Sequence, residues 1–223
     1  MSNSALVSYK KISPHKSVNR KHKIDTITIH CTAGICTVES LGSLFSGSKE
    51  VSSNYGIGND GRIGMYVEEK DRSWCSSNAA NDHRAITIEC SSDRDAPHKI
   101  NDKVYKSLIK LLVDVCKRNG IKALLWKGDK SLIGQVDKQN MTVHRWFANK
   151  ACPGDYIYAR LGQIAKEVNA QLGTASTPTS TAAPAAAAKT IYRVQVGAYS
   201  VKANAEATVK KLKAAGFDAV IVS

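Results

Sequence analysis

Four residues far apart in the chain, His30, Glu89, His144 and Cys152, are of the types that a catalytic zinc site uses. Zinc binds imidazole nitrogen and thiolate sulfur in tetrahedral geometry, and a catalytic site keeps one position open for water. His30, His144 and Cys152 would supply three ligands, with no obvious fourth. Glu89 would then take the proton of the water as general base. These residues predict a hydrolytic site built around Zn²⁺.

The residues before these candidates alternate in a way that would place them on one face of a sheet. Residues 24–30, 85–89 and 141–144 are short β-branched runs that favour strands. Side chains alternate faces along a strand, so each run has an apolar face and a Thr-lined face. Each Thr-lined face ends in one of the two histidines or the glutamate. Taken singly, each could be an ordinary strand-end residue, but neighbouring strands would bring all three together.

The third ligand would come from a loop. Cys152 lies just before a Pro-Gly turn, and a loop of this length can return a thiolate to the strand end that holds His144. Lys150 precedes the thiolate closely, and its ammonium could stabilise a developing oxyanion. Tyr55 could donate a hydrogen bond to the same oxygen. The alternatives are a solvated loop charge for Lys150 and a half-buried strand aromatic for Tyr55.

Hydrophobic periodicity predicts the elements that must position these residues. Helical spacing of apolar residues recurs over roughly 38–46, 102–118 and 156–171, and a glycine follows each of the last two. Residues 59–61 read Asn-Asp-Gly between two apolar runs, which predicts a hairpin turn. We therefore expect an α/β fold, with a central mixed β-sheet flanked by helices.

The charge of the chain predicts a polyanionic partner. Formal net charge is +13 over 223 residues, which fits nucleic acid, a membrane surface or an anionic bacterial wall. Nucleic acid is disfavoured, because no DNA-binding motif is evident and aromatic residues make up only 6%. No segment approaches the ~18 apolar residues of a membrane span. Residues 1–23 lack the apolar region of a secretory signal, so we expect the protein to stay in the cytoplasm until something releases it.

Composition also divides the chain. Residues 174–188 contain no charged and no large apolar residue, which is typical of a linker. This segment would separate a catalytic domain, 1–173, from a small tail, 189–223.

Four motifs, at residues 26–33, 53–57, 85–89 and 142–155, occur in the order of a known family. The chain resembles the N-acetylmuramoyl-L-alanine amidases of the type-2 amidase and peptidoglycan-recognition-protein superfamily, which includes phage endolysins. The resemblance covers about residues 20–170. It implies a zinc amidase that cuts the bond between N-acetylmuramic acid and L-alanine in peptidoglycan, as an endolysin in host lysis. The alternative is a non-catalytic recognition module, since some members lack the thiolate ligand.

The resemblance also implies roles for individual residues. Zn²⁺ would be bound by His30, His144 and Cys152. Glu89 would be the base. Some relatives have His after a Trp in the substrate groove, where this chain has Cys75 after Trp74. The remaining implied contacts are Tyr55 and Lys150 assisting catalysis, and Trp74, Asn78, Asn81 and Arg84 holding the substrate.

The tail is similar to half of a sporulation-related repeat (SPOR) domain, a wall-binding module. Its pattern predicts strand, helix and strand, with Val209 and Leu212 at helical spacing, and Gln195 and Tyr199 are candidate wall contacts. Roughly 35 residues are too few for an independent core. We therefore predict that two tails pair in a homodimer. The alternatives are a tail docked on the catalytic domain, or one that orders only at the wall.

Overall fold

The three β-branched runs lie side by side in a six-stranded mixed sheet, with the third at its edge, in a computed structural model that describes residues 2–173, 201–216 and 221. The strand order is β1-β5-β4-β7-β3-β8, and β4, β7, β3 and β8 are parallel. A separate antiparallel pair, β2 with β6, was not predicted. The strands span Tyr9–Lys10 (β1), Lys16–Ser17 (β2), Thr26–Cys31 (β3), Tyr55–Ile57 (β4), Ile63–Met65 (β5), Arg72–Ser73 (β6), Ala85–Cys90 (β7) and Met141–Thr142 (β8).

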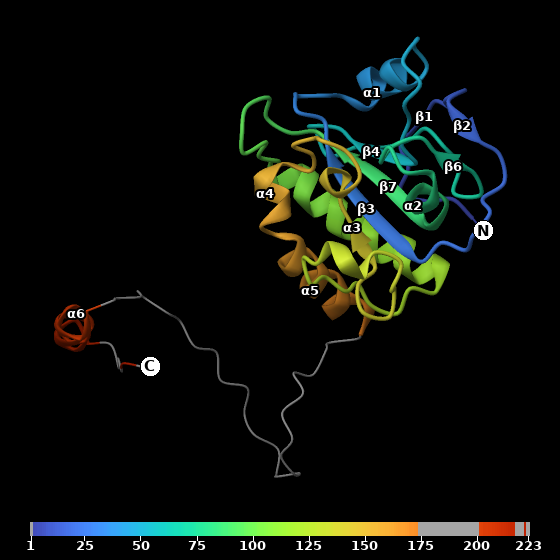
Figure 1. Ribbon diagram of the computed structural model, residues 1–223. Coiled ribbons are helices and arrows are strands. Elements are labelled where there is room, and N and C mark those ends of the chain that lie inside the picture. Colours follow the sequence, from blue (N-terminus) through green and yellow to red (C-terminus); the bar gives the residue numbers. More distant parts are fainter. Residues whose placement is uncertain (1, 174–200, 217–220, 222–223) are drawn as a thin grey trace. The chain divides into compact units, whose positions relative to one another are not determined.

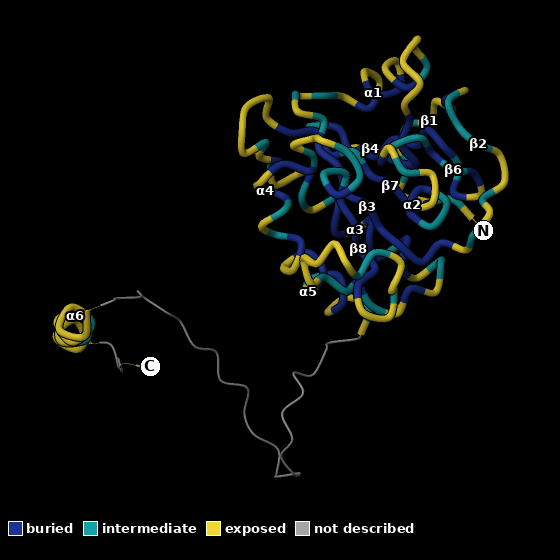
Figure 2. The backbone as a smooth tube through the Cα atoms, viewed as in Figure 1, coloured by how far each residue is buried: buried dark blue, intermediate teal, exposed yellow. Residues whose placement is uncertain are grey.

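The register of these strands confirms the alternation predicted from the sequence. Thr28 pairs with Thr87 of β7 and with Thr142 of β8. The Thr28 and Thr142 hydroxyls are 2.8 Å apart, so the polar face is continuous across the sheet. The isoleucines between them, such as Ile29 and Ile88, are fully buried on the other face. The central strands are dark blue in Figure 2, which marks buried residues.

Helix α3 (Asp102–Asn119) covers the apolar face, and α5 (Leu161–Leu172) packs on α3 (Figure 1). Helix α3 ends at Gly120, whose φ of +68° is in the left-handed region that glycine adopts at low cost. The predicted helix 156–171 is interrupted, because α4 (Gly154–Tyr158) ends before α5 begins.

The polar face is covered by α1 (Val38–Phe45) and by α2 (Ala79–Arg84). Helix α1 approaches β4 closely: a Cβ on Gly56 would lie 2.7 Å from Leu41 Cδ1, so only glycine fits there. Helix α2 was not predicted, because six residues are too few to show a periodic pattern. Its N-terminus is capped by Asn78, whose side chain accepts a hydrogen bond from the Asn81 backbone.

The predicted hairpin joins β4 and β5, which pair antiparallel. Gly58 N–H donates to the carbonyl of Arg62 at 2.9 Å, and Gly61 has a φ of +88°. Turns of this kind need positive φ, which explains the glycine.

The chain divides into two compact units, Met1–Thr177 and Pro178–Ser223. In the second, α6 (Lys202–Ala214) confirms the predicted helix, with Val209 and Leu212 half-buried on it. The linker 174–188, the flanking strands and the wall contacts Gln195 and Tyr199 lie outside the described residues. Within the described part of the chain, no helix combines the length and apolar character of a membrane span.

Candidate metal centre

His30 and Glu89 are directly paired residues at the carboxyl ends of two neighbouring parallel strands. His30 is the fifth residue of β3 and faces Glu89 of β7, with His30 Nδ1 4.0 Å from Glu89 Oε1. The His30 side chain is 1% exposed and that of Glu89 is 17% exposed. The strand pairing thus fixes an imidazole beside the carboxylate of a partly exposed side chain.

His144 comes to the same place from the other side of β3. The predicted strand 141–144 is shorter than expected, because β8 ends at Thr142 and His144 begins the 3₁₀ helix η2 (His144–Trp146). The ring centroids of His144 and His30 are 5.2 Å apart. His144 Nε2 is 3.1 Å from the Ser77 hydroxyl, which orients the ring and leaves Nδ1 for a metal.

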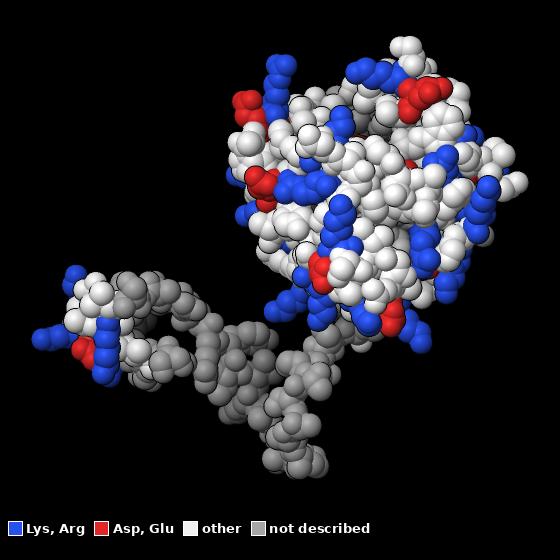
Figure 3. Space-filling view, viewed as in Figure 1, with Lys and Arg blue, Asp and Glu red and all other residues white. Residues whose placement is uncertain are grey.

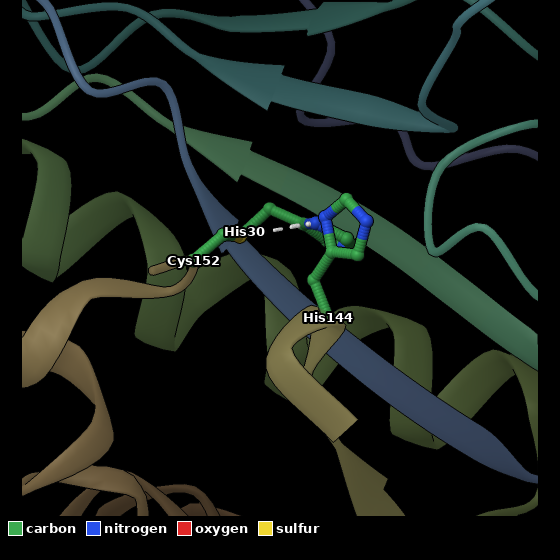
Figure 4. Close-up of side chains that lie close together, drawn as sticks. All are labelled: His30, His144 and Cys152. Atoms are coloured by element: carbon green, nitrogen blue, oxygen red, sulfur yellow. Dashed lines mark hydrogen bonds between the residues drawn. The ribbon is translucent and has the colours of Figure 1, made fainter. Parts of the chain in front are cut away.

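Cys152 returns on the loop after η2, as predicted. Its Sγ lies 3.3 Å from His30 Nδ1. The loop is closed by the Arg145 backbone N–H, which donates to the Cys152 carbonyl at 3.1 Å. Gly154 completes the turn with a φ of +79°, and a Cβ there would lie 2.7 Å from His98 Cβ. Figure 4 shows the three side chains converging from β3, η2 and the loop.

The geometry of these three residues fits a tetrahedral zinc ion. One ligand atom from each of His30, His144 and Cys152 lies within 4.8 Å of the others. Zinc–sulfur and zinc–nitrogen bonds of about 2.3 and 2.0 Å put two tetrahedral ligands about 3.5 Å apart. Within the described residues, His30 Nε2 is buried and has no hydrogen-bond partner. The three donors therefore suit the ligand set of a catalytic zinc ion, which keeps a fourth position for water.

The protonation states of the imidazoles suit metal binding. Burial, and secondarily the neighbouring His144, lowers the pKa of His30 to about 3. Burial also lowers the pKa of His144, and the nearby Lys150 ammonium lowers it further. Both rings are therefore neutral near pH ~7, the form in which histidine binds metals.

The two acidic groups of the site are protonated until a cation is present. Burial, and then the proximity of Cys31, raises the pKa of Glu89 to about 8. A hydrogen bond with Cys31, together with burial, raises the pKa of the Cys152 thiol. A bound cation reverses both effects, because it favours the thiolate and the carboxylate.

Tyr55 is not at this site, so its predicted catalytic contact is wrong. Register pairs Tyr55 with Ile88, which places its side chain on the apolar face, opposite His30 and Glu89. Tyr55 is fully buried there, and its hydroxyl donates to Glu69 Oε1 at 2.7 Å.

Asn81 and Arg84 both make structural contacts within the first unit, and their predicted substrate contacts stay predictions. Asn81 is buried, and its amide donates to the Thr28 hydroxyl at 3.0 Å. Arg84 pairs with Asp25 at 2.6 Å. Asp25 precedes β3, at the opposite end of the strand from His30. At ~3.3 Å per strand residue, the Arg84–Asp25 pair lies about 16 Å from the site.

The other predicted contacts remain predictions. Asn78 is half-buried and caps α2. Trp74 is also half-buried, and its Nε1 donates to the Ser17 hydroxyl at 3.0 Å. Lys150 is exposed on the loop before Cys152 and is close enough to His144 to affect its pKa.

Sequence analysis missed two residues of the site, Ser77 and Cys75. Ser77 hydrogen-bonds His144, and Cys75 Sγ lies 3.9 Å from Glu89 Oε1. Both lie in the irregular segment between β6 and α2, where no periodic pattern of residues predicts which way a side chain points. The one available signal for Cys75 was its position directly after Trp74.

Comparison with protein families agrees with this geometry. Residues 20–155 match the family described as N-acetylmuramoyl-L-alanine amidase, and residues 163–223 match the SPOR domain. The first match spans more than half of the chain, which therefore belongs to the N-acetylmuramoyl-L-alanine amidase family. The chain is a peptidoglycan amidase by family, with a SPOR segment at its C-terminal side.

A solved structure of AmpD, a selenomethionine derivative, shows the same fold. It has 19% identity and a TM-score of 0.55, over 73% of this chain and 96% of that chain. A structure of PlyL has 18% identity and a TM-score of 0.48, over 72% of this chain and 95% of that chain. The PlyG catalytic domain has 17% identity and a TM-score of 0.49, over 77% of this chain and 98% of that chain. None of the curated protein sequences compared matches the chain.

The SPOR match begins within α5, which belongs to the first unit. Leu161, Ile164 and Val168 of this helix are fully buried in the same core as α3. The start of the SPOR match therefore overlaps a helix that the catalytic unit needs for its own packing.

Proposed function

We propose that this protein hydrolyses the amide between N-acetylmuramic acid and L-alanine in peptidoglycan, with Zn²⁺ bound by His30, His144 and Cys152. The observation that carries the proposal is the convergence of these three donors beside Glu89, in a chain of the amidase family. A zinc ion in this position would polarise the scissile carbonyl and lower the pKa of a water to about 7.

Glu89 is the residue placed to move the proton. Its carboxylate is 4.0 Å from His30 and its side chain is partly exposed, which places it beside the proposed position of the attacking water. The carboxylate accepts the proton of that water and delivers it to the leaving nitrogen of L-alanine.

Lys150 supports the charge that develops on the carbonyl oxygen. Its ammonium is exposed on the loop that carries Cys152, near His144. The flexible side chain can approach an oxyanion formed above these residues. Tyr55 has no part in this step, because it lies on the other face of the sheet.

The protein acts in this proposal as a phage endolysin. It would accumulate in the cytoplasm of the infected host and reach the wall after release. Lys and Arg outnumber Asp and Glu over the visible face of the first unit, as Figure 3 shows, which favours binding to an anionic wall. The SPOR segment would add peptidoglycan affinity.

The test is digestion of purified cell wall by the full chain, followed by mass spectrometry of the soluble products. We expect new free amino termini on L-alanine, and their loss in Glu89→Gln. New reducing sugar ends without new amino termini would contradict the proposal. Wall binding without any release would favour the recognition module instead.

A further inference from the structure

A second set of metal donors lies beside the first. One ligand atom from each of His30, Cys75 and Glu89 lies within 4.8 Å of the others. Cys75 Sγ is 3.9 Å from Glu89 Oε1, which in turn is 4.0 Å from His30 Nδ1. Tetrahedral zinc holds sulfur and oxygen ligands about 3.5 Å apart and nitrogen and oxygen ligands about 3.3 Å apart, so the two separations exceed these spacings by about 0.4 and about 0.7 Å.

The donors of this second set have unused binding capacity. Among the described residues, Glu89 Oε2 is a buried atom without a hydrogen-bond partner. Cys75 is a free thiol, and its Sγ makes a long contact with the other oxygen of the same carboxylate. Cys75 and Glu89 are both partly exposed, which gives an ion a path of entry.

We propose that Cys75 and Glu89, beside the ring of His30, form a second, inhibitory site for a thiophilic divalent cation such as Cd²⁺ or excess Zn²⁺. A thiolate selects soft and borderline cations over Mg²⁺ or Ca²⁺. The second ion binds in addition to the catalytic ion, and it displaces the thiol proton of Cys75. It also takes the carboxylate that the proposed mechanism uses as base, so the inhibition, though not the binding, rests on the proposed function.

Cadmium titration of the metal-free full chain tests the binding directly. Thiolate-to-cadmium absorption in the ultraviolet reports each cysteine that becomes a ligand, and equilibrium dialysis counts the ions. We expect two ions per chain in the wild type and one in Cys75→Ser. Cys36→Ser is the matched control, because Cys36 is a half-buried thiol outside both sets, and it should still bind two. Unfolding curves of the two variants check that both are folded.

The two sites are separated by a further variant. Cys152→Ser should lose the ion of the first site but keep the thiolate-to-cadmium absorption of the second site. Cys75→Ser should lack the absorption of the second site. One ion per chain in the wild type, with the same absorption in Cys75→Ser, would overturn the second site. Binding of a Cys75-dependent ion without inhibition of wall digestion would instead count against Glu89 as the base, and leave the site itself standing.

Discussion

His30 Nδ1 and Cys152 Sγ lie 3.3 Å apart although 122 residues separate them in the chain. This pair shows how the fold assembles the site, because one residue lies near the end of a buried strand and the other on a loop. The Cys152 sulfur also forms a hydrogen bond with Cys31. The spacing between the sulfur and the imidazole nitrogen suits two ligands of the zinc ion proposed above.

Replacement of Cys152 by Ser should therefore remove bound zinc and wall digestion together. Zinc content after dialysis, measured by elemental analysis, should fall from about one ion per chain to a small fraction of that. Cys36→Ser is the control and should keep both. Full zinc content in Cys152→Ser would show that the sulfur is not a ligand.

Glu89→Gln separates proton transfer from metal binding. The amide keeps the shape of the side chain but cannot accept a proton, so the digestion rate should fall by about 10²–10⁴-fold. Zinc content should stay unchanged, because Glu89 is not among the three proposed ligands. A loss of zinc as large as the loss of rate would instead make Glu89 a ligand.

Tyr55→Phe should lower stability and leave the digestion rate of the folded protein unchanged. The change removes a buried hydroxyl that donates to Glu69 at 2.7 Å and accepts from Ser4 N–H at 3.0 Å. We expect a loss of about 1–3 kcal/mol in the free energy of unfolding, measured in urea. Tyr105→Phe is the control, because its hydroxyl donates to Glu167 in a partly exposed position. A large fall in rate with unchanged stability would restore a catalytic role for Tyr55.

The contrast between His30 and Tyr55 shows what a sequence can predict here. Alternation is local, so the shared face of His30 and the threonines before it is readable from the chain alone. The face of Tyr55 depends on how β4 pairs with β7, and nothing in residues 53–57 fixes that register. The same limit applies to Cys75, which reaches Glu89 from an irregular segment. The positions of His30 and Glu89 were predicted from alternation along their strands, whereas those of Tyr55 and Cys75 depend on tertiary packing and were not.

The ion pair of buried Asp71 with half-buried Lys16 predicts a pH-dependent contribution to stability. Burial alone would raise the pKa of Asp71, but hydrogen bonds from the Lys16 ammonium at 2.6 Å and from Asn19 N–H at 3.0 Å lower it below its ordinary value. A carboxyl pKa that is lower in the folded state than in the unfolded state stabilises the fold. This contribution is complete at pH values above the unfolded-state pKa, near ~4, and is lost as pH falls through the folded-state pKa.

Asp71→Asn should therefore cost about 1.5–3 kcal/mol near pH ~7. Its unfolding curve in urea should approach that of the wild type as pH falls below ~4. Asp60→Asn is the control: Arg62 lowers the pKa of that carboxyl too, but the pair is exposed. Its cost should stay below about 1 kcal/mol. A difference between Asp71→Asn and wild type that is independent of pH would assign the effect to shape and not to charge.

The tail predicts a homodimer that forms through α6. This helix has no buried residue, yet Ala205, Val209 and Leu212 repeat at helical spacing along its half-buried side. Roughly 35 residues cannot bury a core alone, so a second copy is the partner that we expect to cover this side.

Sedimentation of the full chain should give a dimer, and a chain shortened to residues 1–173 should give a monomer. The shorter chain ends at Gly173, where α5 ends, so its core stays intact. Leu212→Glu should dissociate the dimer, because it places a charge on the apolar side of α6. Lys210→Glu, at an exposed position of the same helix, should not. If the full chain and the shortened chain both sediment as monomers, the tails do not pair, and the tail must meet the wall as a single copy.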